Sequence, residues 1–130
     1  MNQREQLEKA IEVALLARDL IWEGWCQGAL VRDALGDQIA LSQAVGSKVP
    51  VYVCSAGALD VAISRVLGPQ YEPSFYQVAL DVWYEATGLG EMSMSFWNDA
   101  KERTQAEVAD SWDKVAKELK ERLNALEVSA

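Results

Sequence analysis

Apolar side chains recur at steps of three and four residues along the last part of the chain. These positions share one stripe of a helix, whereas charged residues occupy the positions between them. Thr104 and Glu107 have the spacing of a capping box, so Thr104 is the expected N-cap. The pattern predicts a long amphipathic helix that buries its stripe and serves as the scaffold. The stripe comprises Val108, Trp112, Val115, Leu119, Leu123 and Leu126.

Three further segments have helical periodicity. Residues 4–25 combine strong helix formers with a broad apolar face, and Gly24 or Gly28 is expected to end that helix. Residues 51–67 carry little charge and contain small side chains, which indicates a central core helix that starts near Cys54 or Ser55. Residues 73–86 start with a proline, which suits a first helical turn. These segments supply three partners for the C-terminal helix.

The remaining stretches have weaker patterns. Residues 29–41 contain two short apolar runs around a turn-like Leu35-Gly36-Asp37, which fits either a short hairpin or an irregular loop. Residues 42–50 are expected to form a connector that can open with a helical turn over residues 42–45, because Gly46 stops such a turn and Pro50 disfavours helical geometry at the residue before it. Residues 92–97 are ambiguous between a strand and a buried turn. Both interpretations stay open for the first and last of these stretches.

Together these segments predict the fold class. Four helical segments with short connections and no long strand pattern indicate an all-α protein. We expect residues 1–130 to form a single helical domain, a compact bundle of about four helices. A minor β-hairpin near residues 29–41 remains compatible with this bundle.

Charge limits the classes of partner. The chain has 20 acidic and 12 basic residues and a formal net charge of -8. Direct nucleic-acid binding is not expected, because it relies on lysine and arginine displacing counterions from phosphate. The negative charge suits a basic partner surface, or keeps a small protein in solution.

The absence of histidine limits the chemistry. Without histidine, the commonest general base and neutral metal ligand are missing, so neither a metal site nor a cofactor is expected. Cys26 and Cys54 lie in apolar contexts and are expected to be free buried thiols, although a bridge between them stays open. No apolar run reaches membrane-spanning length and no leader pattern begins the chain. These features predict a soluble cytoplasmic protein.

The tripeptide Trp97-Asn98-Asp99 precedes the long helix and has two interpretations. As structure, the indole anchors the loop while Asn98 and Asp99 form side-chain-to-backbone turns. As function, the loop lines a cleft with Trp97 as a stacking wall. Arg103 is placed to pair with Asp99 across this loop. The candidate ligand-binding residues are Trp25, Arg32, Asp33, Trp97, Asn98, Asp99 and Arg103.

Five tryptophans are many for 130 residues. They cannot all be central in a small core, so some should be only partly covered. Partly covered aromatic side chains are enriched at interfaces, which favours a homodimer contact or a partner site.

Several short motifs occur in a recognisable order: Gly24-Trp25, Gly28-Ala29, Arg32-Asp33-Ala34 with Gly36, Cys54 with Gly57-Ala58-Leu59, Trp97-Asn98-Asp99, Arg103-Thr104 and Glu107-Val108. Their order resembles a family of small uncharacterised proteins of actinobacteria and their phages, over residues 16–123. The resemblance implies a shared fold and a bacterial or phage cytoplasmic setting, without implying a reaction. Residues 71–90 match it least, so a contact particular to this protein is expected there.

Three functional hypotheses follow. The leading one is a non-enzymatic protein–protein interaction module, a phage or bacterial accessory or inhibitor protein with an acidic, aromatic-rich surface. The alternative is a small-molecule-binding protein or weak enzyme with a pocket near Trp97, Asp99 and Arg103, to which Asp33 is added. The third is an acidic mimic of nucleic acid that blocks a DNA-binding protein.

Overall fold

The computed structural model describes residues 1–46 and 50–129. These residues form six helices and one two-stranded antiparallel sheet, as the prediction of a mainly α-helical fold required. Two of the helices are short, so the expected bundle of about four helices corresponds to the four long ones. In chain order the elements are α1 (Gln3–Glu23), β1 (Val31–Arg32), α2 (Leu41–Gly46), β2 (Tyr52–Val53), α3 (Ser55–Leu67), α4 (Pro73–Thr87), α5 (Met94–Asn98) and α6 (Gln105–Val128).

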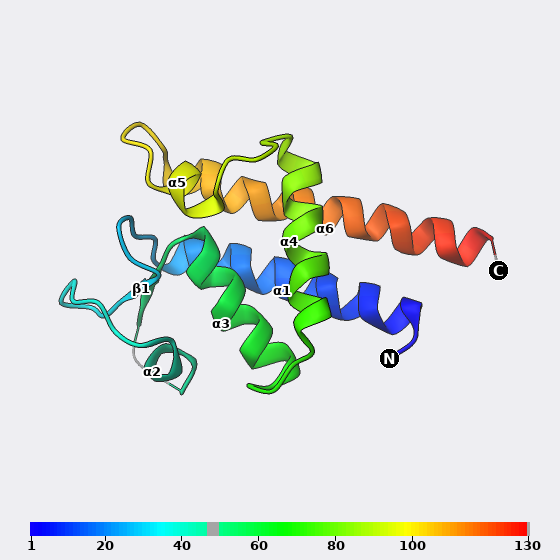
Figure 1. Ribbon diagram of the computed structural model, residues 1–130, viewed down its shortest axis with the longest axis horizontal. Helices are drawn as coiled ribbons and strands as arrows, with labels where there is room; N and C mark the ends of the chain where they lie inside the picture. The colour runs from blue at the N-terminus through cyan, green and yellow to red at the C-terminus, as the bar shows by residue number, and fades with distance from the viewer. Residues whose placement is uncertain (47–49, 130) are drawn as a thin grey trace.

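The two longest helices, α1 and α6, form an antiparallel pair that runs the length of the molecule. Figure 1 shows the start of α1 and the end of α6 at one end of the molecule, and α5, β1 and the loop between α5 and α6 at the other. Val108, Trp112, Val115 and Leu119 of α6 are fully buried, which confirms this part of the predicted apolar stripe. Leu123 and Leu126, at the end of the stripe, are only half-buried. The capping box is formed: the Thr104 hydroxyl accepts from the Glu107 backbone N–H at 3.2 Å, and the Glu107 carboxylate accepts from the Thr104 backbone N–H at 3.1 Å.

Helices α3 and α4 pack against the central pair. Helix α3 packs along α1, while α4 crosses α6 (Figure 1). The first helix ends at Glu23, because the Gly24 backbone is extended and joins the sheet region. Helix α3 begins at Ser55, as expected from the sequence, and the preceding Tyr52 and Val53 form strand β2. Cys54 is the N-cap of α3, and its sulfur accepts a hydrogen bond from the Gly57 backbone N–H at 3.3 Å.

The small sheet joins segments that are distant in the sequence. Strand β1 pairs with β2, so Val31 lies opposite Val53, and no second strand element lies within residues 29–41. A tight turn does follow β1, closed by a single bridge between Arg32 and Gln38. The predicted turn is therefore present, but the sheet partner comes from the other side of α2.

The predicted connector at residues 42–50 is helical in its first half. Helix α2 occupies it up to Gly46, and residues 47–49 lie outside the described part of the chain. The buried Ala44 fixes this short helix to the core, and its backbone oxygen accepts from the Arg65 guanidinium of α3 at 3.3 Å.

The stretch at residues 92–97, ambiguous in sequence, is resolved as helix. Ser93 caps α5, with its hydroxyl accepting from the Phe96 backbone N–H at 3.3 Å. Met94 is buried and its backbone N–H donates to the Tyr84 hydroxyl at 3.0 Å. Helix α5 is therefore fixed at its start by α4.

Three buried polar side chains occur among the described residues, and each accepts an indole N–H. An indole N–H buried without a partner would be costly, so these bonds let large tryptophans enter the core. Trp22, by contrast, is 54% exposed, in line with the expectation that not all five tryptophans are central. The pairs are Trp25 with Asn98 at 2.8 Å, Trp83 with Ser111 at 3.0 Å and Trp112 with Ser55 at 3.0 Å.

None of the described helices combines the length and apolar composition that crossing a lipid bilayer requires.

Large apolar side chains also reach the surface of the described part of the chain. The exposed apolar side chains are Met1, Trp22, Leu30, Leu35, Tyr52, Val78, Met92, Phe96 and Val128.

Gly57 supplies a direct test of how β1 meets α3. A Cβ atom there would lie 2.0 Å from the backbone oxygen of Leu30, an impossible contact. We predict that Gly57→Ala lowers the free energy of unfolding by about 3 kcal/mol, measured by urea denaturation. Gly46→Ala, where no described residue outside its own helix turn lies within 4 Å of the added carbon, should change it by less than about 1 kcal/mol. Equal effects of the two substitutions would contradict the described packing.

Candidate functional site

Asn98 is the centre of the candidate site. Its side chain is fully buried at the end of α5. The amide oxygen accepts from the Trp25 indole N–H at 2.8 Å and from the Ser55 backbone N–H at 3.0 Å. The amide nitrogen donates to the Cys26 backbone oxygen at 3.1 Å and to the Asp99 carboxylate at 2.9 Å. One side chain thus joins the segment after α1, the start of α3, and α5.

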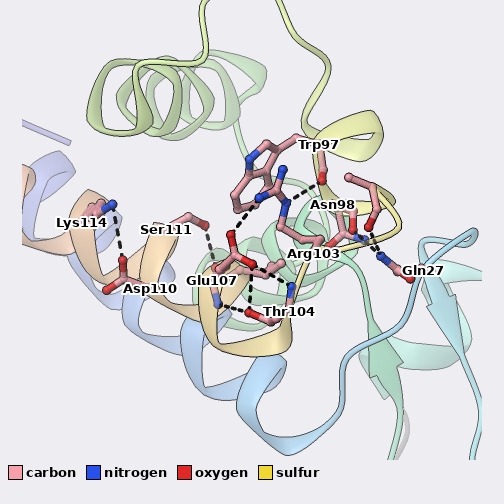
Figure 2. A network of polar contacts seen from close by, with 11 residues as sticks. Gln27, Trp97, Asn98, Arg103, Thr104, Glu107, Asp110, Ser111 and Lys114 are labelled. Carbon is pink, nitrogen blue, oxygen red and sulfur yellow. Dashed lines mark hydrogen bonds and ion pairs between the residues drawn. The ribbon is translucent and has the colours of Figure 1, made fainter.

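A second group of contacts fastens the segment after α1 to the residues around Asn98. The Gln27 side-chain amide donates to the backbone oxygens of Asn98 and Ala100, both at 2.9 Å, as Figure 2 shows for Gln27 beside Asn98. The Gly28 backbone N–H donates to the Asp99 carboxylate at 3.0 Å. Asp99 therefore acts as an acceptor for two internal donors.

Trp97 and Arg103 form a separate stack at the entry to α6. Trp97 is 8% exposed, and the Arg103 guanidinium lies 4.2 Å from the centre of its ring. Arg103 donates to the Trp97 backbone oxygen at 3.0 Å and to the Glu107 carboxylate at 2.8 Å (Figure 2). The expected pairing of Arg103 with Asp99 is thus replaced by pairing with Glu107, one helical turn away. The hydrogen bond from Arg103, aided by that from Thr104, lowers the pKa of Glu107.

Arg32 and Asp33 stabilise local loops. The Arg32 guanidinium donates to the backbone oxygens of Gly36 at 2.9 Å and Gln27 at 3.2 Å. The Asp33 carboxylate accepts backbone N–H bonds from the turn that follows it, including that of Leu35 at 2.9 Å. Arg32 therefore touches the edge of the site through Gln27, whereas Asp33 holds its own turn.

The candidate residues that were expected to share one pocket do not line a single depression. One depression, of about 220 Å³, includes Asp99, and another, of about 540 Å³, includes Arg103. Trp25, Trp97 and Asn98 line neither of them. The first is lined by Gly28, Ala29, Leu30, Cys54, Ser95 and Asp99, and the second by Ala100, Lys101, Glu102, Arg103 and Glu107.

Two residues of the site had no clear sequence signal. Ser55 is fully buried between the Trp112 indole and the Asn98 amide, and Gln27 anchors the α5 region. The one signal in the sequence was that each is a polar residue beside a cysteine in an apolar stretch. Both residues bond Asn98, which could not be predicted because Asn98 is far from them in the sequence.

The two cysteines are buried and free. Burial raises the pKa of Cys26 to about 11, and it also raises the pKa of Cys54. Both side chains are therefore protonated thiols at neutral pH. Within residues 1–46 and 50–129, no three acidic or cysteine side chains converge as a metal site would require.

Residues 6–118 match the model of a family of unknown function, DUF6197. The chain belongs to this family. Comparison with curated proteins and with solved structures gave no match. The DUF6197 match includes every candidate site residue from Trp25 to Arg103, and it ends within α6.

The hydrogen bonds of Asn98 predict a large effect of its removal. Asn98→Ala leaves the Trp25 indole and the Ser55 backbone N–H without their acceptor, so the free energy of unfolding should fall by about 3 kcal/mol. Asn124→Ala, at an exposed position of α6, is the matched control and should cost less than about 0.5 kcal/mol. Urea denaturation measures both. A small effect at position 98 would show that these bonds do not hold the site together.

The lowered pKa of Glu107 predicts that the stability of the fold depends on pH. Because its pKa is lowered in the folded protein, its contribution to stability is present above 4.5, its ordinary value, and is lost as the pH falls through the folded-state pKa. A glutamine side chain can still complete a capping box, so Glu107→Gln isolates the charge. The variant should melt below the wild type at pH 7, and the difference should vanish in acid. A difference that stays constant with pH in thermal melts would contradict this assignment.

Proposed function

We propose that this protein is a non-enzymatic interaction module that binds a protein partner through the surface around α5. This α5 surface is defined by Leu30, Ser95, Phe96 and Asp99. The observation that carries the proposal is Phe96, which is 71% exposed on a helix whose other large side chains are buried. An exposed phenylalanine beside a depression is typical of a contact residue.

The geometry of α5 supports a shared contact face. Phe96 and Asp99 are three residues apart, so their side chains emerge on neighbouring positions of the helix. Leu30 is 47% exposed and lines the adjoining depression of about 220 Å³ together with Ser95 and Asp99. The surface therefore combines two apolar side chains with one carboxylate.

The internal bonding of the candidate residues favours binding over catalysis. Both donors and the acceptor of the Asn98 amide are engaged, and Arg103 is engaged by Trp97 and Glu107. Asn98 and Arg103 therefore hold the α5 surface in place, while its exposed apolar side chains contact the proposed partner. The net charge of -8 favours a partner with a basic face and speeds the encounter with it.

The setting we propose is the cytoplasm of a bacterium or of a phage-infected cell, where the protein acts as an accessory or inhibitor. The sequence resemblance to actinobacterial and phage proteins supports this setting. A second copy of the chain is one partner that the same surface would fit, which would make the protein a homodimer.

The depression next to Asp99 favours a second candidate function, binding of a small molecule. The Asp99 carboxylate would orient a polar ligand in this depression. The volume of about 220 Å³ lies below the range of about 300–1,000 Å³ that is common for such sites, so we rank this function second.

A comparison of three baits tests the proposed surface. Wild type, Phe96→Ser and the control Val128→Ser, which alters an apolar side chain at the far end of α6, are used to capture proteins from a bacterial lysate. We expect one protein to bind wild type and the control but not Phe96→Ser. With this protein purified, calorimetry should show at least about 10-fold weaker binding to the Phe96 variant.

Two results would contradict the proposal. One is a purified partner whose affinity is the same for Phe96→Ser and wild type. The other is a wild-type protein that captures nothing specific and also remains monomeric at high concentration.

A further inference from the structure

The backbone places the two cysteines opposite each other. The Cys26 backbone N–H donates to the Val53 oxygen at 3.0 Å, and the Val53 backbone N–H donates to the Gly24 oxygen at 3.0 Å. These bonds form a parallel bridge in which Trp25 faces Val53. The next residue on each strand is a cysteine, so Cys26 and Cys54 are the next pair in register.

This register fits disulfide geometry. Adjacent strands lie about 4.8 Å apart, and disulfides join Cα atoms that are about 4.4–6.8 Å apart. Residues facing each other on paired strands point to the same face of the sheet. The two sulfurs therefore share one face next to β2.

The surroundings of the sulfurs agree with this placement. The Cys26 thiol contacts the backbone oxygens of Ala29 at 3.6 Å and Tyr52 at 3.5 Å. Ala29 also lines the depression that contains Cys54. Ala29 therefore contacts the Cys26 sulfur and also lines the depression that Cys54 lines.

We propose that Cys26 and Cys54 are a redox-sensitive pair that forms a reversible intramolecular disulfide with a peroxide. The resting Cys54 thiol is buried and protonated, but Cys54 lines the depression and its sulfur accepts a hydrogen bond from the Gly57 backbone N–H at the start of α3. This bond stabilises the thiolate once the thiol loses its proton, so Cys54 reacts first. Its sulfur attacks one peroxide oxygen, breaks the O–O bond and becomes a sulfenic acid, while the other oxygen leaves as water or an alcohol. The Cys26 sulfur then attacks the Cys54 sulfur, and the S–S bond forms as the sulfenic oxygen leaves as water.

The bond would act on the junction that positions α5. The Cys26 backbone oxygen accepts from Asn98, and Cys54 caps α3 and lines the depression beside Leu30 and Asp99. A disulfide ties these two positions together and changes the wall of the depression. The inference itself does not depend on the proposed partner, because bond formation is measured on the isolated protein.

Thiol counting on the folded protein tests the proposal. The reduced chain is treated with hydrogen peroxide, the peroxide is removed with catalase, and a maleimide is added in denaturant before mass spectrometry. We expect loss of both reactive thiols, a monomeric chain lighter by two hydrogen atoms, and recovery of both thiols with dithiothreitol.

Single variants identify the order of the two steps. Cys26→Ser should stop at a Cys54 sulfenic acid that dimedone traps, and Cys54→Ser, which retains a good N-cap residue, should leave Cys26 largely unmodified. The wild-type measurement stands even if either variant fails to fold. The proposal is overturned if both wild-type thiols remain free, if only covalent dimers form, or if Cys54 gains oxygen while Cys26 stays free.

Discussion

The buried amide of Asn98 is the interaction on which this end of the molecule depends. Its side chain accepts from Trp25 and Ser55 and donates to Cys26 and Asp99. These partners come from three segments that are distant in the sequence. A buried amide is favourable only when its donors and acceptor are satisfied, so each segment must reach its place for the others to be stable. Helix α5 is too short to hold its position by itself, and this network fixes it.

The same solution recurs in the rest of the core. Trp83 and Trp112 each place an indole N–H on a buried serine hydroxyl, Ser111 and Ser55. The apolar rings fill the space among α1, α3, α4 and α6, while short polar side chains satisfy the one polar atom of each ring. The antiparallel α1 and α6 pair supplies the rigid frame, and the loop end carries the polar junction (Figure 1).

Local sequence signals predicted the helical frame. The capping box at Thr104 and the stripe through Trp112 were readable because their partners lie within one or two turns. The pairing of β1 with β2 was not predictable, since its register is set by packing against α3 across 20 residues of chain rather than by local pattern. Proximity in sequence favoured Asp99 as the partner of Arg103, but the helix brings Glu107 to the same guanidinium.

The candidate site was predictable only in part. Trp25, Asn98 and Asp99 do lie in one neighbourhood, joined by the Asn98 amide. Asp99 and Arg103 line two different depressions. This could not be predicted, because it depends on how the side chains pack in three dimensions and not on their spacing in the sequence. Membership in DUF6197 assigns no reaction, and internal use of the polar groups favours a structural role for most of them.

The most direct test of the central claim is native-state hydrogen exchange at the tryptophan indoles, followed by NMR. We predict that the Trp25 indole N–H, bonded to Asn98, exchanges as slowly as the indoles of Trp83 and Trp112, while that of the exposed Trp22 exchanges rapidly. A Trp25 indole that exchanged as fast as Trp22 would contradict it.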